Sequence, residues 1–162
     1  MRRLLLILLC ATAACAPAPP PLSNTADSPE ALGRVVLERL TARDTEGLRQ
    51  LMLTRDEFEA HVWPHLPASR PETNMPMSFV WNRLQQQSQG HLAQVVARHG
   101  GQRLTFVSIA TTGESSAYGD VRVDRESTMT VRTVAGEVEE VKLFGSIVRQ
   151  GSRYKVFSYV TE

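Results

Sequence analysis

The chain has 162 residues, with 18 basic against 17 acidic side chains and 42% hydrophobic residues. The basic residues are scattered, which excludes the basic patch expected of a nucleic-acid-binding protein. Both cysteines lie within the first 15 residues, so the rest of the chain can form neither a disulfide nor a cysteine metal site.

The first sixteen residues have the pattern of an export signal. Arg2 and Arg3 precede an apolar run over residues 4–10, which then gives way to small residues and prolines. A helix needs about 20 apolar residues to cross a bilayer, and this run is much shorter. We therefore expect a secretory signal rather than a permanent membrane span.

The segment Thr12-Ala13-Ala14-Cys15 resembles the lipobox of bacterial lipoproteins. The resemblance implies that residues 1–14 are a signal peptide and that Cys15 becomes the lipid-modified first residue of the mature chain. Its acyl chains would anchor the protein to the cell membrane or the outer membrane, facing the periplasm, because each buried CH₂ contributes about 0.8 kcal/mol. The alternative is ordinary cleavage after Ala13, which leaves Cys15 as a free thiol in a soluble exported protein.

Residues 15–27 are predicted to be a linker. Four of the nine prolines lie here, and proline-rich segments are extended at about 3.1 Å per residue. Such a segment can hold a domain up to roughly 35 Å from a lipid surface. Residues 28–162 then form one domain, which has the size of an ordinary globular domain.

The first half of this domain is predicted to be helical. Ser28 and Pro29 mark a helix start, Asp44 begins a second short helix, and the capping-box pattern from Thr54 to Glu57 begins a third that runs up to Pro64. A longer helix is expected over residues 76–99, ending at two glycines. Its apolar stripe consists of Met77, Val80, Trp81, Leu84, Leu92 and Val95.

The second half is predicted to be a sheet of about four strands, over residues 104–112, 118–134, 138–149 and 153–160. Alternation of apolar and polar residues indicates half-buried strands, with a bulge near Arg125. Short connections make neighbouring strands antiparallel. Helices followed by hairpin-linked strands predict an α+β domain with the N-terminal helices packed on a curved antiparallel sheet.

Two segments carry a resemblance to a known superfamily: LTARDTEGLRQLM, a helix-corner-helix, and FGSIVRQGSRYKVFSYV, a closing hairpin. Both resemble the cone-shaped domains named after nuclear transport factor two. The resemblance implies a helical layer over a curved sheet that encloses a pocket. A cystatin-like sheet on one long helix is the alternative.

Candidate catalytic residues are few. His91 falls on the stripe of the long helix, three residues after Ser88, and could be a general base in a small lyase or isomerase. The pair lacks an orienting acid in the sequence. Asp120 and Asp124 alternate with apolar residues and are expected to face water.

Binding is the other hypothesis, and the better supported one. Trp81, His91, Phe144 and Tyr154 are candidates to line a pocket for a small apolar ligand. An envelope protein is the other candidate partner. His61 and His65 are four residues apart, but Pro64 separates them and a third ligand is lacking, so we expect no metal site and no cofactor. The sequence thus favours an anchored, non-enzymatic binding protein of unknown specificity.

Overall fold

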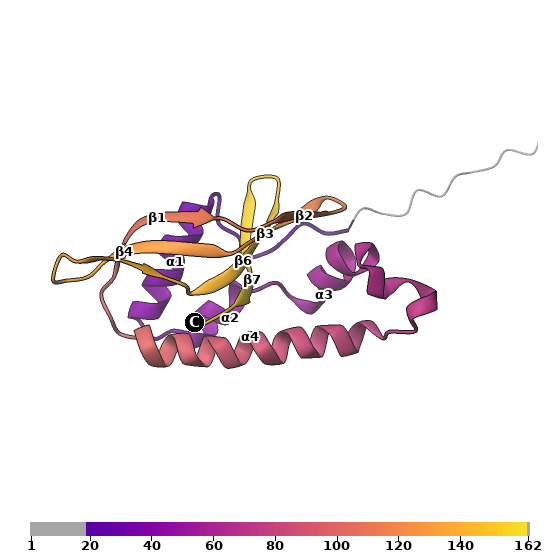
Figure 1. The fold of residues 1–162 in the computed structure, drawn as a ribbon, viewed down its shortest axis with the longest axis horizontal. Helices are drawn as coiled ribbons and strands as arrows, with labels where there is room; N and C mark the ends of the chain where they lie inside the picture. The colour runs from indigo at the N-terminus through magenta and orange to yellow at the C-terminus, as the bar shows by residue number, and fades with distance from the viewer. Residues whose placement is uncertain (1–18, 162) are drawn as a thin grey trace, which may run out of the picture.

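Four α-helices, several shorter helical turns and seven strands make up residues 19–161, the part of the chain that this computed structural model describes (Figure 1). The arrangement is α+β, as predicted. The predicted signal peptide and the predicted lipidation site at Cys15 lie outside the described residues.

The helices begin and end close to the positions that local sequence signals predict. The side chain of Ser28 accepts a hydrogen bond from the backbone N–H of Ala31 at 3.1 Å, and Thr54 forms a capping box with Glu57. The helical elements are α1 (Pro29–Thr41), α2 (Thr45–Gln50), α3 (Arg55–Glu57), a π-helical turn η1 (Phe58–Val62), the 3₁₀ turns η2 (Trp63–His65), η3 (Pro67–Ser69) and η4 (Pro71–Thr73), and α4 (Met77–His99).

The strands form two antiparallel sheets. The three-stranded sheet has the order β1-β4-β5, from β1 (Thr105–Thr111), β4 (Ser127–Arg132) and β5 (Val138–Val141). The four-stranded sheet has the order β2-β3-β6-β7, from β2 (Ser115–Tyr118), β3 (Val121–Arg125), β6 (Phe144–Gln150) and β7 (Arg153–Tyr159). Figure 1 shows α4 running along the length of the molecule, with α1 beside β1 and β4.

Two of the predicted long strands are each divided between the two sheets. The strand predicted over residues 118–134 breaks at Glu126, whose φ of 56° is left-handed, so β3 and β4 belong to different sheets. The strand predicted over residues 138–149 likewise divides into β5 and β6. Together with the connection from β1 to β2, the chain therefore passes three times from one sheet to the other, which bends the antiparallel layer around the helices.

The apolar side chains form two clusters. The larger cluster lies among α1, α4 and the strands, and includes Leu32, Leu92 and Ile147. The smaller cluster packs Leu22 with Phe58 and Trp81, whose ring centroids are 5.3 Å apart. Burial of these side chains is what joins the helical half to the sheets.

The structure departs from the predicted linker at residues 20–27. Leu22 is only 3% exposed, and its backbone N–H donates to Oε1 of Gln150 at 2.9 Å. Ala26 and Tyr154 exchange two backbone hydrogen bonds of 2.9 and 2.8 Å. These residues therefore pack against the domain instead of forming a stalk, because β7 offers them an open edge that composition does not reveal.

Within residues 19–161, no helix is both long enough and apolar enough to cross a membrane.

Candidate functional site

The four residues predicted to line a pocket do not come together. Trp81 belongs to the smaller apolar cluster, whereas Phe144 and Tyr154 belong to the larger one. Trp81 and His91 are ten residues apart on α4, or about 15 Å along the helix axis. Their shared stripe therefore extends over two clusters, and it does not converge on one cavity.

His91 and Ser88 both have structural partners. The Oγ of Ser88 is buried and accepts the backbone N–H of Tyr159 at 2.9 Å. Nδ1 of His91 lies 3.0 Å from Oγ1 of Thr161, whose hydroxyl donates to Gln94. Among the described residues, no carboxylate contacts either side chain, so they do not form a nucleophile–base–acid set.

His61 holds the start of the described chain to the domain. It is 1% exposed, with Nε2 2.8 Å from the carbonyl oxygen of Pro20 and Nδ1 3.0 Å from Oδ1 of Asp120. His65 lies instead against Gly119. In the part of the chain that the structure describes, no three His, Cys, Asp or Glu residues could hold a metal ion.

The two aspartates expected to face water differ in exposure. The side chain of Asp120 is 53% exposed. Burial raises its pKa, but hydrogen bonds from His61 and Gln150 outweigh this effect and hold the pKa below the usual value. Asp124 is only 19% exposed because Nε of Arg149 lies 3.1 Å from its carboxylate, which corrects the expectation that it faces water.

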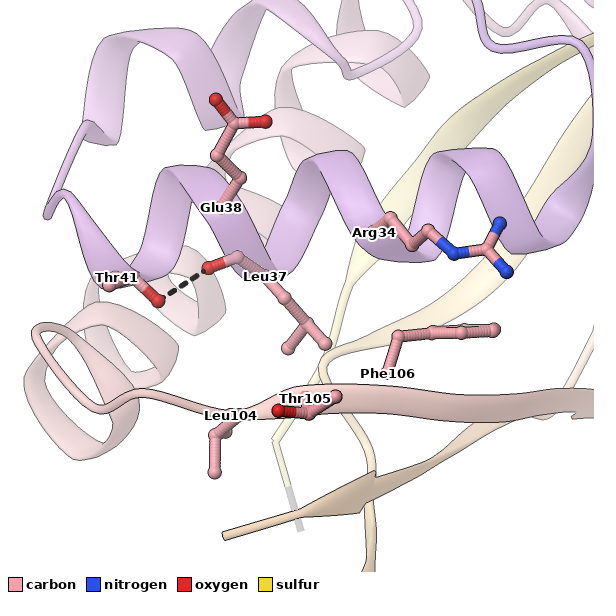
Figure 2. A pocket seen from close by; sticks show the side chains of 7 residues that line it. All are labelled: Arg34, Leu37, Glu38, Thr41, Leu104, Thr105 and Phe106. Atoms are coloured by element: carbon pink, nitrogen blue, oxygen red, sulfur yellow. Dashed lines mark hydrogen bonds between the residues drawn. The ribbon is translucent and has the colours of Figure 1, made fainter. Parts of the chain in front are cut away.

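A groove between α1 and β1 carries both apolar and charged groups (Figure 2). Its volume is about 350 Å³. It is lined by Arg34, Leu37, Glu38 and Thr41 from α1, and by Leu104, Thr105 and Phe106 from β1 and the residue before it. Figure 2 shows Leu37 and Phe106 pointing into the space between the helix and the strand.

Close packing of α1 on β1 shapes this groove. A Cβ atom at Gly33 would lie 2.7 Å from the ring of Phe106, so only glycine permits this approach. The guanidinium of Arg34 lies 4.8 Å from the centroid of the Phe106 ring, a cation–π contact. At the other end, the hydroxyl of Thr41 reaches the carbonyl oxygens of Leu37 and Gln102 at 3.0 and 2.9 Å.

The strand beside the groove is an open sheet edge. β1 pairs with β4 on one side, and no described residue bonds to the backbone of its other side. It contains no charged residue and no proline, and five of its seven residues are exposed. Natural proteins usually protect such edges with charges, prolines or a covering segment.

Two of the other three sheet edges, those of β5 and β7, are protected. β5 carries Glu139 and Glu140. The free side of β7 is covered by Ala26 and by residues 51–53, which bond to Tyr154 and Val156. β1 therefore differs from these two edges in offering unpaired backbone groups beside an apolar-floored groove.

The sequence predicts the strand of residues 104–112 but does not identify this site. The uncharged run LTFVSIATT was a usable signal, but its meaning depends on which strand lies at the edge. No protein family, no curated protein and no solved structure matches this chain.

Proposed function

We propose that the protein is an exported lipoprotein, anchored through Cys15, whose domain binds an extended polypeptide segment of an envelope protein along β1. The binding part depends on one observation, the open uncharged edge of β1 beside the groove under α1. The anchoring part is supported by residues 12–15 of the sequence. The resemblance of residues 40–52 and 144–160 to nuclear transport factor two-like domains stays a prediction.

An added strand matches the chemistry of this edge. Its backbone would pair with the N–H and C=O groups of β1 that no described residue occupies, which supplies affinity without sequence preference. Alternate side chains of an added strand point to the same face. Those on the groove side would contact Leu37, Leu104 and Phe106, which favours an apolar residue at every second position.

Charged groups at the rim would add specificity. Arg34 and Glu38 are exposed and lie one helical turn apart on α1. A peptide with an acidic group near Arg34 or a basic group near Glu38 would gain a charge-assisted hydrogen bond. Arg34 also covers one face of Phe106, so its contact orders the floor of the groove.

The test is a selection of binders from a displayed library of random eight-residue peptides. Selected peptides should shift the backbone amide NMR signals of β1 and α1. Val107→Lys and Ala110→Lys place charges on exposed edge positions and should weaken binding by about tenfold or more, equivalent to about 1.4 kcal/mol. Val107 faces no β4 residue in the register, so the change leaves strand pairing in place.

The matched control is Val138→Lys on β5, the opposite edge of the same sheet, where the residue is also exposed. This variant should bind the peptides as the natural chain does. Peptides that shift other elements, or that bind Val107→Lys and Ala110→Lys unchanged, would contradict the proposal.

A further inference from the structure

We infer that one end of the domain lies directly on the bilayer, with Phe79 and Met75 in contact with lipid. This end consists of α3, the turns η1 to η4 and the first turn of α4. The inference rests on the proposed anchoring at Cys15, and it goes further by assigning a docking surface and an orientation.

The tether between Cys15 and the domain is short. Residues 20–27 are fastened to the domain, so only residues 16–19 separate Cys15 from Pro20. An extended chain spans at most about 3.6 Å per residue. The Cα atom of Pro20 therefore lies within about 18 Å of that of Cys15, whatever the conformation between them.

Hydrogen bonds hold Pro20 and the residues after it to the domain. Nε2 of the buried His61 ring lies 2.8 Å from the carbonyl oxygen of Pro20, and Nδ1 lies 3.0 Å from Oδ1 of Asp120. Ser23, three residues after Pro20, donates both its backbone N–H and its hydroxyl to the carboxylate of Glu57, at 2.8 and 2.9 Å. Detaching the segment would leave these buried polar groups without partners, which opposes its release.

Pro20 lies close to the start of the described chain, whose place in the molecule fixes where the tether attaches. The described chain begins at the end of the molecule where α3 and the η turns lie, and these turns project further along the long axis than the chain start (Figure 1). A short tether at this end therefore brings the projecting turns to the bilayer.

The surface of that end combines exposed apolar side chains with balanced charges. Phe79 is 58% exposed and Met75 is 40% exposed; the other exposed large apolar side chains of the described chain are the smaller valines of β1 and the β4–β5 hairpin, Val107, Val134 and Val138. Exposed charges between residues 55 and 83 are balanced, with Arg55, Arg70 and Arg83 against Asp56, Glu59 and Glu72. Contact would then come from insertion of the apolar side chains of Phe79 and Met75 into the lipid, and it would not require anionic lipid.

This orientation suits the proposed binding site. Figure 1 shows α1, β1 and the β4–β5 hairpin at the opposite end of the long axis. The groove and the open strand edge would point away from the lipid surface, where a partner could reach them.

The chain offers a clean way to test this arrangement. Lipidation would block the thiol of Cys15, and Cys10 lies in the predicted signal peptide, so a new cysteine would be the single reactive thiol. We would label Ser78→Cys, next to Phe79, with an environment-sensitive fluorophore. The matched control is Ala135→Cys on the β4–β5 hairpin; both positions are exposed.

The lipidated full-length variants would be reconstituted into phosphatidylethanolamine–phosphatidylglycerol vesicles that contain brominated acyl chains. Bromine should quench the label at position 78 several-fold more than the label at position 135. Adding Met75→Ser and Phe79→Ser to Ser78→Cys should remove most of this difference, and high salt should not.

Equal quenching at the two positions in protein that floats with the vesicles would overturn the docking surface while leaving the anchor in place. Protein that does not float would overturn both the anchor and the docking surface. Peptide binding at β1 is measured independently, so its failure would not be confused with either outcome.

Discussion

At the scale of single residues, the most unusual feature is a buried ion pair between Glu57 and Lys155. Lys155 is fully buried, and its Nζ lies 2.9 and 2.8 Å from the two carboxylate oxygens of Glu57. The same carboxylate accepts from Ser23 and from the backbone N–H of Thr54. Because every carboxylate oxygen is hydrogen-bonded, this pair joins β7, α3 and the N-terminal segment.

Lys155→Met should destabilise the domain by about 3–5 kcal/mol, because it leaves the Glu57 carboxylate buried without its cation. Urea unfolding at neutral pH measures this loss. Adding Glu57→Gln to Lys155→Met should recover part of it, since the amide carries no charge. A cost below about 1 kcal/mol for Lys155→Met would show that the pair is not buried in solution.

Acid should destabilise the domain through the same carboxyl group. Burial raises the pKa of Glu57, but hydrogen bonds from Lys155, Ser23 and Thr54 outweigh it and lower the pKa from 4.5 to about 2. A pKa lower in the folded state stabilises folding above pH 4.5, and this contribution, on the order of 3 kcal/mol, is lost as the pH falls toward 2.

Unfolding curves in urea between pH 7 and pH 2 measure this dependence. The variant Glu57→Gln should show a shallower loss of stability over the same range, because its side chain does not titrate. Parallel pH profiles for the two proteins would refute the assignment.

Ser88 is a second residue whose role the structure defines. Ser88→Ala leaves the backbone N–H of Tyr159 buried without an acceptor, so we expect a loss of about 1–3 kcal/mol in the free energy of unfolding. Gln87→Ala, at the exposed neighbouring position of α4, is the control and should change it by less than about 0.5 kcal/mol. A neutral Ser88→Ala would remove the structural role and reopen the catalytic one.

At the scale of elements, the N-terminal segment and the residues after α2 each form a single bridge to β7. Ala26 pairs with Tyr154 in the antiparallel sense, and Met52 lies beside Val156 in the parallel sense. Both cover the edge of β7 that would otherwise be open. The contrast with β1, which lacks such cover, is what directs the binding proposal to β1.

Ala26→Pro removes the N–H that donates to the carbonyl of Tyr154. We expect the amide of Tyr154, which donates back to Ala26, to exchange with deuterium at least tenfold faster, for a local loss of about 1.4 kcal/mol. The amide of Val123, on β3 and separated from β7 by β6, is the internal reference and should stay unchanged. Unchanged exchange at Tyr154 would show that the segment does not pair with β7.

At the scale of the whole molecule, the two ends have different properties. One end carries the start of the described chain, the η turns and exposed Phe79, and the other carries the groove and the β4–β5 hairpin (Figure 1). An anchored protein with this polarity presents its binding surface away from the membrane. The proposed anchor would therefore decide which end of the molecule a partner can reach.

Cys15→Ser should move the protein from the membrane fraction to the soluble fraction, because lipid attachment requires the thiol. Intact mass of the purified natural protein should show a chain that begins at Cys15 and carries acyl groups. A Cys15→Ser protein that still sediments with membranes, or a natural protein with an unmodified thiol, would refute the anchor.

Local sequence signals predicted the helices well because caps act within one turn. Ser28, Asp44 and Thr54 each bond to a backbone N–H three residues later. The strand boundaries were predicted less well. A strand that changes sheets at Glu126 keeps its apolar alternation on both sides of the break, so the pattern does not show the break.

The candidate site was missed for a related reason. Aromatic residues on one helical stripe were expected to share a pocket, but α4 is long enough to contact two separate clusters. The actual groove is lined by Leu37 and Phe106, which are ordinary apolar residues in the sequence. What makes them a site is the close approach of α1 to an edge strand at Gly33.

The amino-acid sequence by itself determined the α+β class, the helix starts and the expectation of export, because these depend on signals within a few residues of one another. Only the tertiary structure decided which strand lies open, that residues 20–27 belong to the domain, and that Lys155 meets Glu57. These features join residues as many as 128 positions apart, and such pairs form only when the folded chain brings two distant backbones together.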